Sequence, residues 1–379
     1  MSHGLAHVYS RLRLNCNDEF RSSPNGAVSY QLQGLNMKVG MESVVSYFPE
    51  KVMKRSDFAY LDAVIPKGQE ALFKAADEIR RLDDEHAVEI LAENVTRKAL
   101  NNANLVASDI DFIIAANIGG RRVFPMIGTY IHEHVAFNIE TPVVNIQNFC
   151  ASFVDGLNLA WKLVLSGAYK RVLVVAVTAV GPVTSRTGWG IDQTNPAASF
   201  FGDGSGAAIV SAENIKCEFL SYANHTLGEL YDHLSMELMP NQNPSLKEKA
   251  GVKSDSGIYI AMDEWFIEWG MTLGTKHMIP TLKDALTKAG LTLSDLNMVF
   301  LHHAVDMFTK KWIQDGIEAG IAKGKWKEAF NKIGNCGNVD VAAMLADLSG
   351  KKEIPSGSII ALYPPGLGGH TPCMVLKWL

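Results

Sequence analysis

The chain has 379 residues, of which 47% are hydrophobic, and it carries a formal net charge of −5 at pH 7. This length allows a large core and two packed halves or two domains. The slightly acidic balance without a long basic run argues against nucleic acid as a partner. The longest apolar stretch, Val172 to Val183, is interrupted and too short to span a membrane.

Residues 1–37 are polar and mixed, and they predict an N-terminal extension without a secretory signal. The five cysteines are odd in number and dispersed, without metal-ligand spacing. Reduced thiols, a cytoplasmic location and no bound metal are therefore expected.

Helical and strand patterns alternate after the extension. In the first half we expect helices at 85–101 and 125–134, strands at 112–116, 143–146 and 172–177, and a helix that begins at Cys150. A glycine-rich turn, 202–206, precedes a strand at 206–211; since a strand follows it, a phosphate loop is disfavoured. In the second half we expect helices at 263–289, 306–320 and 335–348, and strands at 298–301, 358–362 and 374–378. Such alternation predicts a layered α/β protein.

The chain contains an internal repeat. Residues 99–114 and 285–300 are identical at six of sixteen positions, at an offset of 186 residues. The same offset relates Cys150 to Cys336. A duplicated α/β unit is therefore predicted, with one half at 38–215 and the other at 216–379.

Cys150 is the candidate nucleophile. It lies between a predicted strand and a predicted helix, where the helix dipole and unpaired N–H groups favour the thiolate. On position alone, the alternative is a small buried hydrophobic residue, as most free cysteines are.

Several motifs, in order, resemble the β-ketoacyl synthase III (chalcone-synthase-like) branch of the thiolase superfamily. Cys150 and the three residues after it resemble the nucleophile turn of that branch, and residues 201–208, FGDGSGAA, resemble its FGDGAGA segment. His302 begins HHAV where the branch has HQAN, Asn335 lies where it has GNTSA, and residues 366–368 match its C-terminal GxG loop. The resemblance implies a five-layered αβαβα fold made of two duplicated halves, and a homodimer.

The resemblance also implies a reaction. Cys150 would take an acyl group from a thioester, and a malonyl- or β-ketoacyl-type thioester would lose CO2 or otherwise form an enolate and condense with it in a Claisen reaction. His302 and Asn335 would donate hydrogen bonds to the enolate oxygen, and the backbone N–H groups of Cys150 and Leu367 would form the other oxyanion hole. No cofactor is implied, because the acyl groups are carried as thioesters of coenzyme A or of the phosphopantetheine of an acyl carrier protein.

Further residues have predicted roles at the entrance and the dimer interface. Phe124, before Pro125, would reach into the acyl pocket of the partner subunit. A basic rim for coenzyme A or an acidic carrier protein would comprise Arg121, Arg122, Lys310 and Lys311. Val305 and Met307 depart from the branch's pattern, which favours a specialised lipid or polyketide pathway over ordinary fatty-acid initiation.

Other interpretations stay open. The same fold can move an acyl group to an alcohol or amine without forming a carbon–carbon bond. His302 and Asp306 form an HxxxD motif, which occurs in acyltransferases that use no cysteine. His303 competes with His302, although neighbouring strand residues point in opposite directions, and Asn335 also suits a helix cap. A non-enzymatic subunit paired with a sister synthase is the last alternative.

Overall fold

The computed structural model of this chain describes residues 37–63, 65, 70, 74–180, 199–238, 258–262, 264–366 and 369–379. All elements below belong to one unit, Lys38–Leu379. Cys16 and Leu367 lie outside the described residues.

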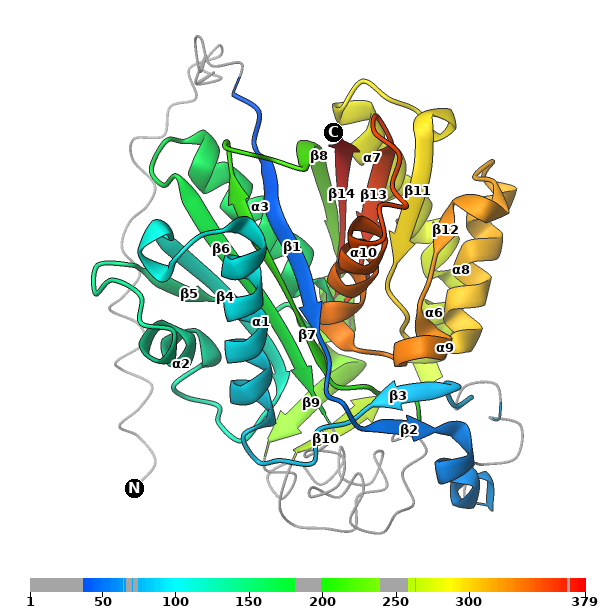
Figure 1. Ribbon diagram of the computed structural model, residues 1–379. Coiled ribbons are helices and arrows are strands. Elements are labelled where there is room, and N and C mark those ends of the chain that lie inside the picture. The colour runs from blue at the N-terminus through cyan, green and yellow to red at the C-terminus, as the bar shows by residue number, and fades with distance from the viewer. Residues whose placement is uncertain are drawn as a thin grey trace, which may run out of the picture. The chain divides into compact units, whose positions relative to one another are not determined.

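Two five-stranded sheets form the framework (Figure 1). The first sheet has the order β1 (Gly40–Tyr47), β7 (Gly204–Ser211), β6 (Arg171–Ala179), β4 (Phe112–Gly119) and β5 (Val143–Asn145). The second has the order β8 (Cys217–Thr226), β14 (His370–Trp378), β13 (Ile359–Tyr363), β11 (Leu296–Leu301) and β12 (Trp326–Lys327).

The two sheets share one topology. In each, the first three strands of the order are antiparallel neighbours and the last three are parallel neighbours. The parallel strands read as continuous apolar runs because both faces are covered. This correspondence confirms the predicted duplication of an α/β unit.

Helices form three layers with the sheets between them. Helices α3 (Ser152–Leu165) and α10 (Asp340–Gly350) lie in the middle, where α3 contacts β6 and β14 and α10 contacts β1 and β11. Helices α1 (Ala87–Ala103) and α2 (Ile127–His134) cover the outer face of the first sheet. Helices α7 (Ile279–Lys288) and α8 (Asp306–Glu318) join the core on the outer side of the second sheet. The predicted five-layered αβαβα fold is confirmed.

The smaller elements complete the description. They comprise the strand pairs β2 (Val52–Lys54) with β3 (Glu78–Arg80) and β9 (Leu234–Leu238) with β10 (Ile258–Met262), helices α6 (Glu264–Leu273) and α9 (Phe330–Ile333), and a π-helical turn at Gly274–Met278. Helix 263–289 was predicted as continuous; it is α6 and α7 joined by the π turn. Short 3₁₀ turns lie at Arg55–Ala63, Ala107–Asp109 (η2), Phe149–Ala151 (η3), Gly228–Asp232 (η5), Leu293–Asp295 (η8), Lys323–Lys325 and Gly337–Val339 (η10).

The sequence repeat has a local structural cause. In η2 the Asp109 carboxylate accepts a hydrogen bond from Val106 N at 2.9 Å, and in η8 Asp295 does the same for Thr292 N at 2.8 Å. The repeated Ser-Asp pair thus caps the same turn before β4 and before β11.

The offset between the halves changes after this turn. The starts of η3 and η10, of α3 and α10, and of β6 and β13 all differ by 188 residues (Phe149 to Gly337, Ser152 to Asp340, Arg171 to Ile359). The structural counterpart of Cys150 is therefore Asn338, and the match of Cys150 with Cys336 at an offset of 186 does not reflect equivalent positions.

Candidate active site

Cys150 lies in the short turn η3, which runs directly into α3. Only 3% of its surface is exposed. The residue before it, Phe149, has φ = 51°, a left-handed conformation that is strained for a bulky side chain. Ser152 supports this turn, because its Oγ donates to Phe149 O at 2.7 Å and accepts from Asn148 N at 3.0 Å. The sequence therefore presents Cys150 on a rigid, strained turn at the start of a helical segment.

His302 follows the end of β11 and is the side chain that meets Cys150. Its Nδ1 lies 2.8 Å from Asp340 Oδ2, and its ring also forms a hydrogen bond with Cys150. Because Nδ1 is occupied by Asp340, Nε2 is the nitrogen that faces the sulfur. Burial alone would lower the pKa of His302, but the Cys150 and Asp340 charges raise it to about 10.

Asp340 is a site residue that the sequence reasoning missed. It is fully buried at the first position of α10, where its Oδ1 accepts from Cys336 N at 2.8 Å and its Oδ2 accepts from His303 N at 3.2 Å. From the sequence, an aspartate at the start of a helix is an ordinary capping residue. Nothing in the local pattern links it to a histidine 38 residues earlier.

His303 takes a different partner from His302. Its ring is also 1% exposed, but Nε2 lies 3.1 Å from Glu328 Oε2. The hydrogen bond from His303 holds the pKa of Glu328 below its usual value, although burial opposes this. The two neighbouring rings thus face different surroundings, and His302 is the one beside the thiol.

Asn335 lies close to both partners of the thiol–imidazole pair. Its Nδ2 donates to Ala304 O at 2.7 Å, and its Oδ1 accepts from Gly337 N at 2.8 Å. Its backbone pairs with Phe201, which packs against Cys150. One amide hydrogen is bound to Ala304, and the second N–H of the same amide stays available for a substrate oxygen.

Asp306 does not serve His302. Its carboxylate lies 3.2 Å from Lys74 Nζ and 2.7 Å from Lys310 Nζ. These two lysines and hydrogen bonds from them lower the pKa of Asp306 against the effect of burial. The HxxxD spacing in the sequence therefore does not correspond to a His302–Asp306 pair.

The C-terminal glycine loop lies against the nucleophile turn. A Cβ on Gly366 would come within 2.9 Å of Asn148 O and 3.1 Å of Ala151 N, so a side chain has no room there. The predicted oxyanion donor Leu367 N–H follows directly but lies outside the described residues, so its role stays a prediction.

The predicted rim cations have different partners. Arg121 Nε lies 3.1 Å from Glu89 Oε1, Lys310 pairs with Asp306 and Lys311 pairs with the buried Asp315. Arg122 is exposed. Three of the four charges are thus neutralised within the chain, and the rim role stays a prediction. Phe124 is 87% exposed and precedes α2.

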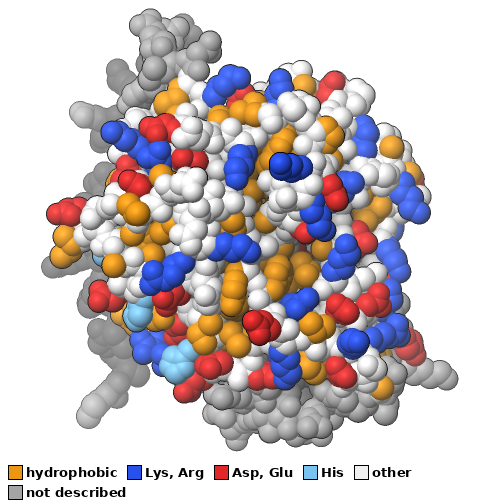
Figure 2. All heavy atoms as spheres, in the orientation of Figure 1, with side chains coloured by type: hydrophobic (Ala, Val, Ile, Leu, Met, Phe, Trp, Pro, Cys, Tyr) orange, Lys and Arg blue, Asp and Glu red, His pale blue; other side chains and the backbone are white. Residues whose placement is uncertain are grey.

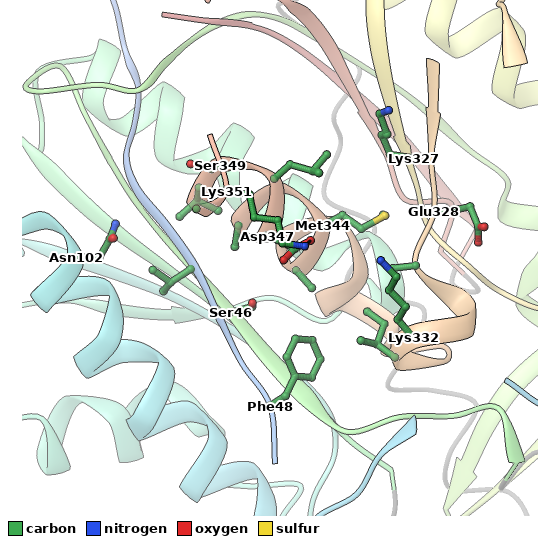
Figure 3. Close-up of a pocket in the computed structure, with 18 of the residues that line it drawn as sticks. Ser46, Phe48, Asn102, Lys327, Glu328, Lys332, Met344, Asp347, Ser349 and Lys351 are labelled. Atoms are coloured by element: carbon green, nitrogen blue, oxygen red, sulfur yellow. Dashed lines mark hydrogen bonds and ion pairs between the residues drawn. The ribbon is translucent and has the colours of Figure 1, made fainter. Parts of the chain in front are cut away.

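A groove with a volume of about 800 Å³ lies along the outward face of α10 (Figure 3). Its apolar part includes Phe48 and Met344, and Lys327, Lys332 and Lys351 stand around it. Figure 2 shows hydrophobic side chains near the centre of this face with Lys and Arg side chains around them. The groove contains none of the predicted catalytic residues.

Two searches of the described residues found nothing. No group of three or more His, Cys, Asp or Glu side chains among them is arranged to hold a metal ion. No described helix is both long and apolar enough to cross a bilayer.

Comparisons with known proteins agree with the geometry. A family model for 3-oxoacyl-[acyl-carrier-protein (ACP)] synthase III matches residues 144–228, which include Cys150 and the FGDGSGAA segment. The chain is 24% identical over 345 residues to β-ketoacyl-[acyl-carrier-protein] synthase III of Fusobacterium nucleatum, covering 90% of this chain and 98% of that protein. It is 26% identical over 351 residues to the same enzyme of Caldanaerobacter subterraneus, covering 89% and 97%.

Solved structures show the same fold. β-Ketoacyl-[acyl carrier protein] synthase III of Thermus thermophilus matches with a TM-score of 0.73 at 20% identity, over 90% of this chain and 99% of that one. OleA of Xanthomonas campestris, solved with bound lauric acid and lauroyl-CoA, matches with a TM-score of 0.76 at 17% identity, over 91% and 100%. These findings confirm the predicted resemblance of this chain, in sequence and in fold, to the β-ketoacyl synthase III branch of the thiolase superfamily.

Proposed function

We propose that this chain is a condensing enzyme of the β-ketoacyl synthase III type, with Cys150 as the residue that carries the acyl group. The observation that carries the proposal is the buried contact of Cys150 with His302, with the Asn335 amide held beside both. The sequence relatives support the same reaction class.

The first half-reaction is acyl transfer to the enzyme. The Cys150 thiolate attacks the carbonyl carbon of an acyl thioester, and the carrier leaves as a thiol after taking one proton. The α3 N-terminal end and the strained turn at Phe149 present the sulfur with its surrounding backbone N–H groups. The N–H groups of Cys150 and Leu367 are the proposed donors to the tetrahedral intermediate.

The second half-reaction forms the carbon–carbon bond. A malonyl-type thioester loses CO2, and negative charge develops on its thioester oxygen. His302 Nε2–H and the second Asn335 N–H are the proposed donors to that oxygen. The enolate carbon then attacks the acyl-Cys150 carbonyl and releases a β-ketoacyl thioester. Transfer to an alcohol or amine is not favoured, because it would not need these two donors.

The substrates and partners are the less defined part of the proposal. We infer acyl and extender thioesters of coenzyme A or acyl carrier protein, without a resident cofactor; OleA, similar in fold, binds lauroyl-CoA. A homodimer is supported by β5, which lies at the edge of the first sheet, and by the exposed Val123, Phe124 and Ile139 in the segments that flank α2. The cytoplasmic location rests on the cysteine pattern alone.

A single-turnover experiment tests the proposed reaction. The protein is loaded with an acyl thioester, mixed with malonyl thioester, and analysed for CO2 and product by mass spectrometry. We expect one CO2 per β-ketoacyl thioester. An ester or amide product formed without CO2 would contradict condensation.

Asn335 separates the two half-reactions. Asn335→Ala is expected to load acyl groups normally but to release CO2 roughly 10²- to 10³-fold more slowly, as for the loss of one oxyanion donor. Asn335→Asp keeps an oxygen for Gly337 N–H but removes the amide donor, so it should show the same split. Equal damage to loading and CO2 release in both variants would mean that Asn335 is structural.

A further inference from the structure

We propose that Asp340 is a positioning residue that holds His302 as the Nδ1–H form, so that the Nε2–H donor of the second half-reaction is the proton taken from Cys150. The inference rests on the proposed function for its catalytic meaning. Its structural part concerns only the side chains of Cys150, His302 and Asp340.

The hydrogen bonds around Asp340 define its state. Asp340 Oδ1 accepts from Cys336 N and Oδ2 accepts from His303 N, and a backbone N–H can only donate. Both carboxylate oxygens are thus used as acceptors, in a site with 0% exposure, and these bonds favour the charged form. His302 Nδ1, 2.8 Å from Oδ2, must therefore carry a hydrogen.

This arrangement leaves Nε2 bare in neutral His302. Because it faces Cys150, Nε2 accepts the thiol proton: the S–H bond breaks, the N–H bond forms, and a thiolate–imidazolium pair results. Although burial lowers the pKa of His302, the charges of Cys150 and Asp340 raise it to about 10, in agreement with this pair at neutral pH.

The proton keeps its place through both half-reactions. After acylation, Cys150 is an uncharged thioester and the departing carrier thiolate takes a proton from solvent. Asp340 is then the anion that still stabilises the imidazolium, so Nε2–H is present when the enolate forms. When the condensation product leaves, the C–S bond breaks and the thiolate returns beside the same imidazolium. Charges balance, because one carboxylate is lost as CO2 and one thiolate is regenerated.

The other ionisable groups near the site act elsewhere. The groups that act on His302 are Cys150 from η3 and Asp340 from α10. The neighbouring His303 faces Glu328, and Asp203 and Arg81 act on Cys336. A change in the pH response of His302 on mutation of Asp340 is therefore attributable to that carboxylate.

The test compares two aspartates of one helix. Asp340→Asn removes the charge beside His302, whereas Asp347→Asn, the control, removes one from the groove side of α10, where Asp347 pairs with Lys351 at 2.8 Å (Figure 3). The rate of Cys150 alkylation by iodoacetamide is measured from pH 5 to 10. At pH 6.5 we expect a loss of about ten-fold or more for Asp340→Asn, the size of a hydrogen bond to a charged group, and a shift of the profile to higher pH. Asp347→Asn should match the wild type.

Two outcomes would overturn the inference. A folded Asp340→Asn protein with the wild-type alkylation profile would show that Asp340 is only structural. Independently, ¹⁵N-histidine NMR of the wild-type protein should show His302 with a proton on Nδ1; a neutral ring protonated on Nε2 alone would refute the assignment even if the variant does not fold. Neither measurement uses an acyl substrate, so failure of this inference is distinct from failure of the proposed function.

Discussion

At the residue scale, the chemistry depends on charges that have almost no contact with water. Cys150 is 3% exposed, and His302 and Asp340 are 1% and 0% exposed. Burying a charge is costly unless it is paired and hydrogen-bonded. Each of these three side chains contacts the next, and Asp340 has two backbone donors besides His302. The site is therefore a linked set in which removal of one member leaves another charge without its partner.

The sequence predicted only the part of this set that motifs mark. Cys150 and His302 belong to segments whose order and spacing are typical of one family. Asp340 occupies a position where an acidic residue is an ordinary helix cap, and its contact with His302 arises from tertiary packing between β11 and α10. The choice between His302 and His303 also needed the structure, because sequence alone shows that two neighbouring rings diverge but not toward what.

At the element scale, glycines in the FGDGSGAA segment permit the close packing of the two halves. A Cβ on Gly202 would lie 2.2 Å from Ile333 O and 2.9 Å from Cys336 Sγ, and one on Gly206 would lie 2.5 Å from Ala342 Cβ. The segment therefore lets β7 approach both the Asn335 loop and α10. This is the physical reason for the glycines, and a phosphate loop is not needed to explain them.

Gly202→Ala tests this role. The new methyl group must displace the loop that carries Asn335, so we expect the free energy of unfolding to fall by about 1–3 kcal/mol and CO2 release to slow. Denaturant unfolding and the single-turnover assay measure the two effects. Gly228→Ala is the control, because a Cβ there meets nothing within 4 Å. A Gly202→Ala protein as stable and active as the control would refute the packing argument.

Element prediction succeeded where the pattern was long or buried and failed where it was weak. The parallel strands β4, β6, β11 and β13 appear as apolar runs and were located from the sequence. Strands β1 and β8 were missed; β8 alternates between buried and partly exposed residues along much of its length, and no turn motif marks either strand. The change of offset from 186 to 188 was also invisible, because two residues added in a loop leave no periodic signal.

At the scale of the whole molecule, the duplication distributes the site between the halves. Strands β5 and β12 occupy equivalent edges of the two sheets; the first leads into the Cys150 turn and the second into the Asn335 segment. The first half thus supplies the nucleophile, and the second supplies His302, Asn335 and Asp340. The division at residue 215 stays a prediction, although every strand of the first sheet ends by Ser211 and the second sheet begins at Cys217.

The proposed homodimer gives Phe124 a function outside its own subunit. If its exposed ring enters the acyl pocket of the partner, Phe124→Ala should enlarge that pocket and shift acyl preference toward longer chains. Competition among acyl thioesters of different length measures the shift. Ile139→Ala removes an equally exposed side chain of the same surface region and should leave the preference unchanged. An identical chain-length profile for the wild type and Phe124→Ala would count against the pocket role.

The central claim, that Cys150 carries the acyl group, is tested most directly by intact-protein mass spectrometry after incubation with acyl thioesters. We expect one added acyl mass in the wild type and none in Cys150→Ala. Cys336→Ala should still be labelled, because burial raises the pKa of the Cys336 thiol well above its usual value and keeps it protonated. An acyl mass that persists in Cys150→Ala would contradict the account.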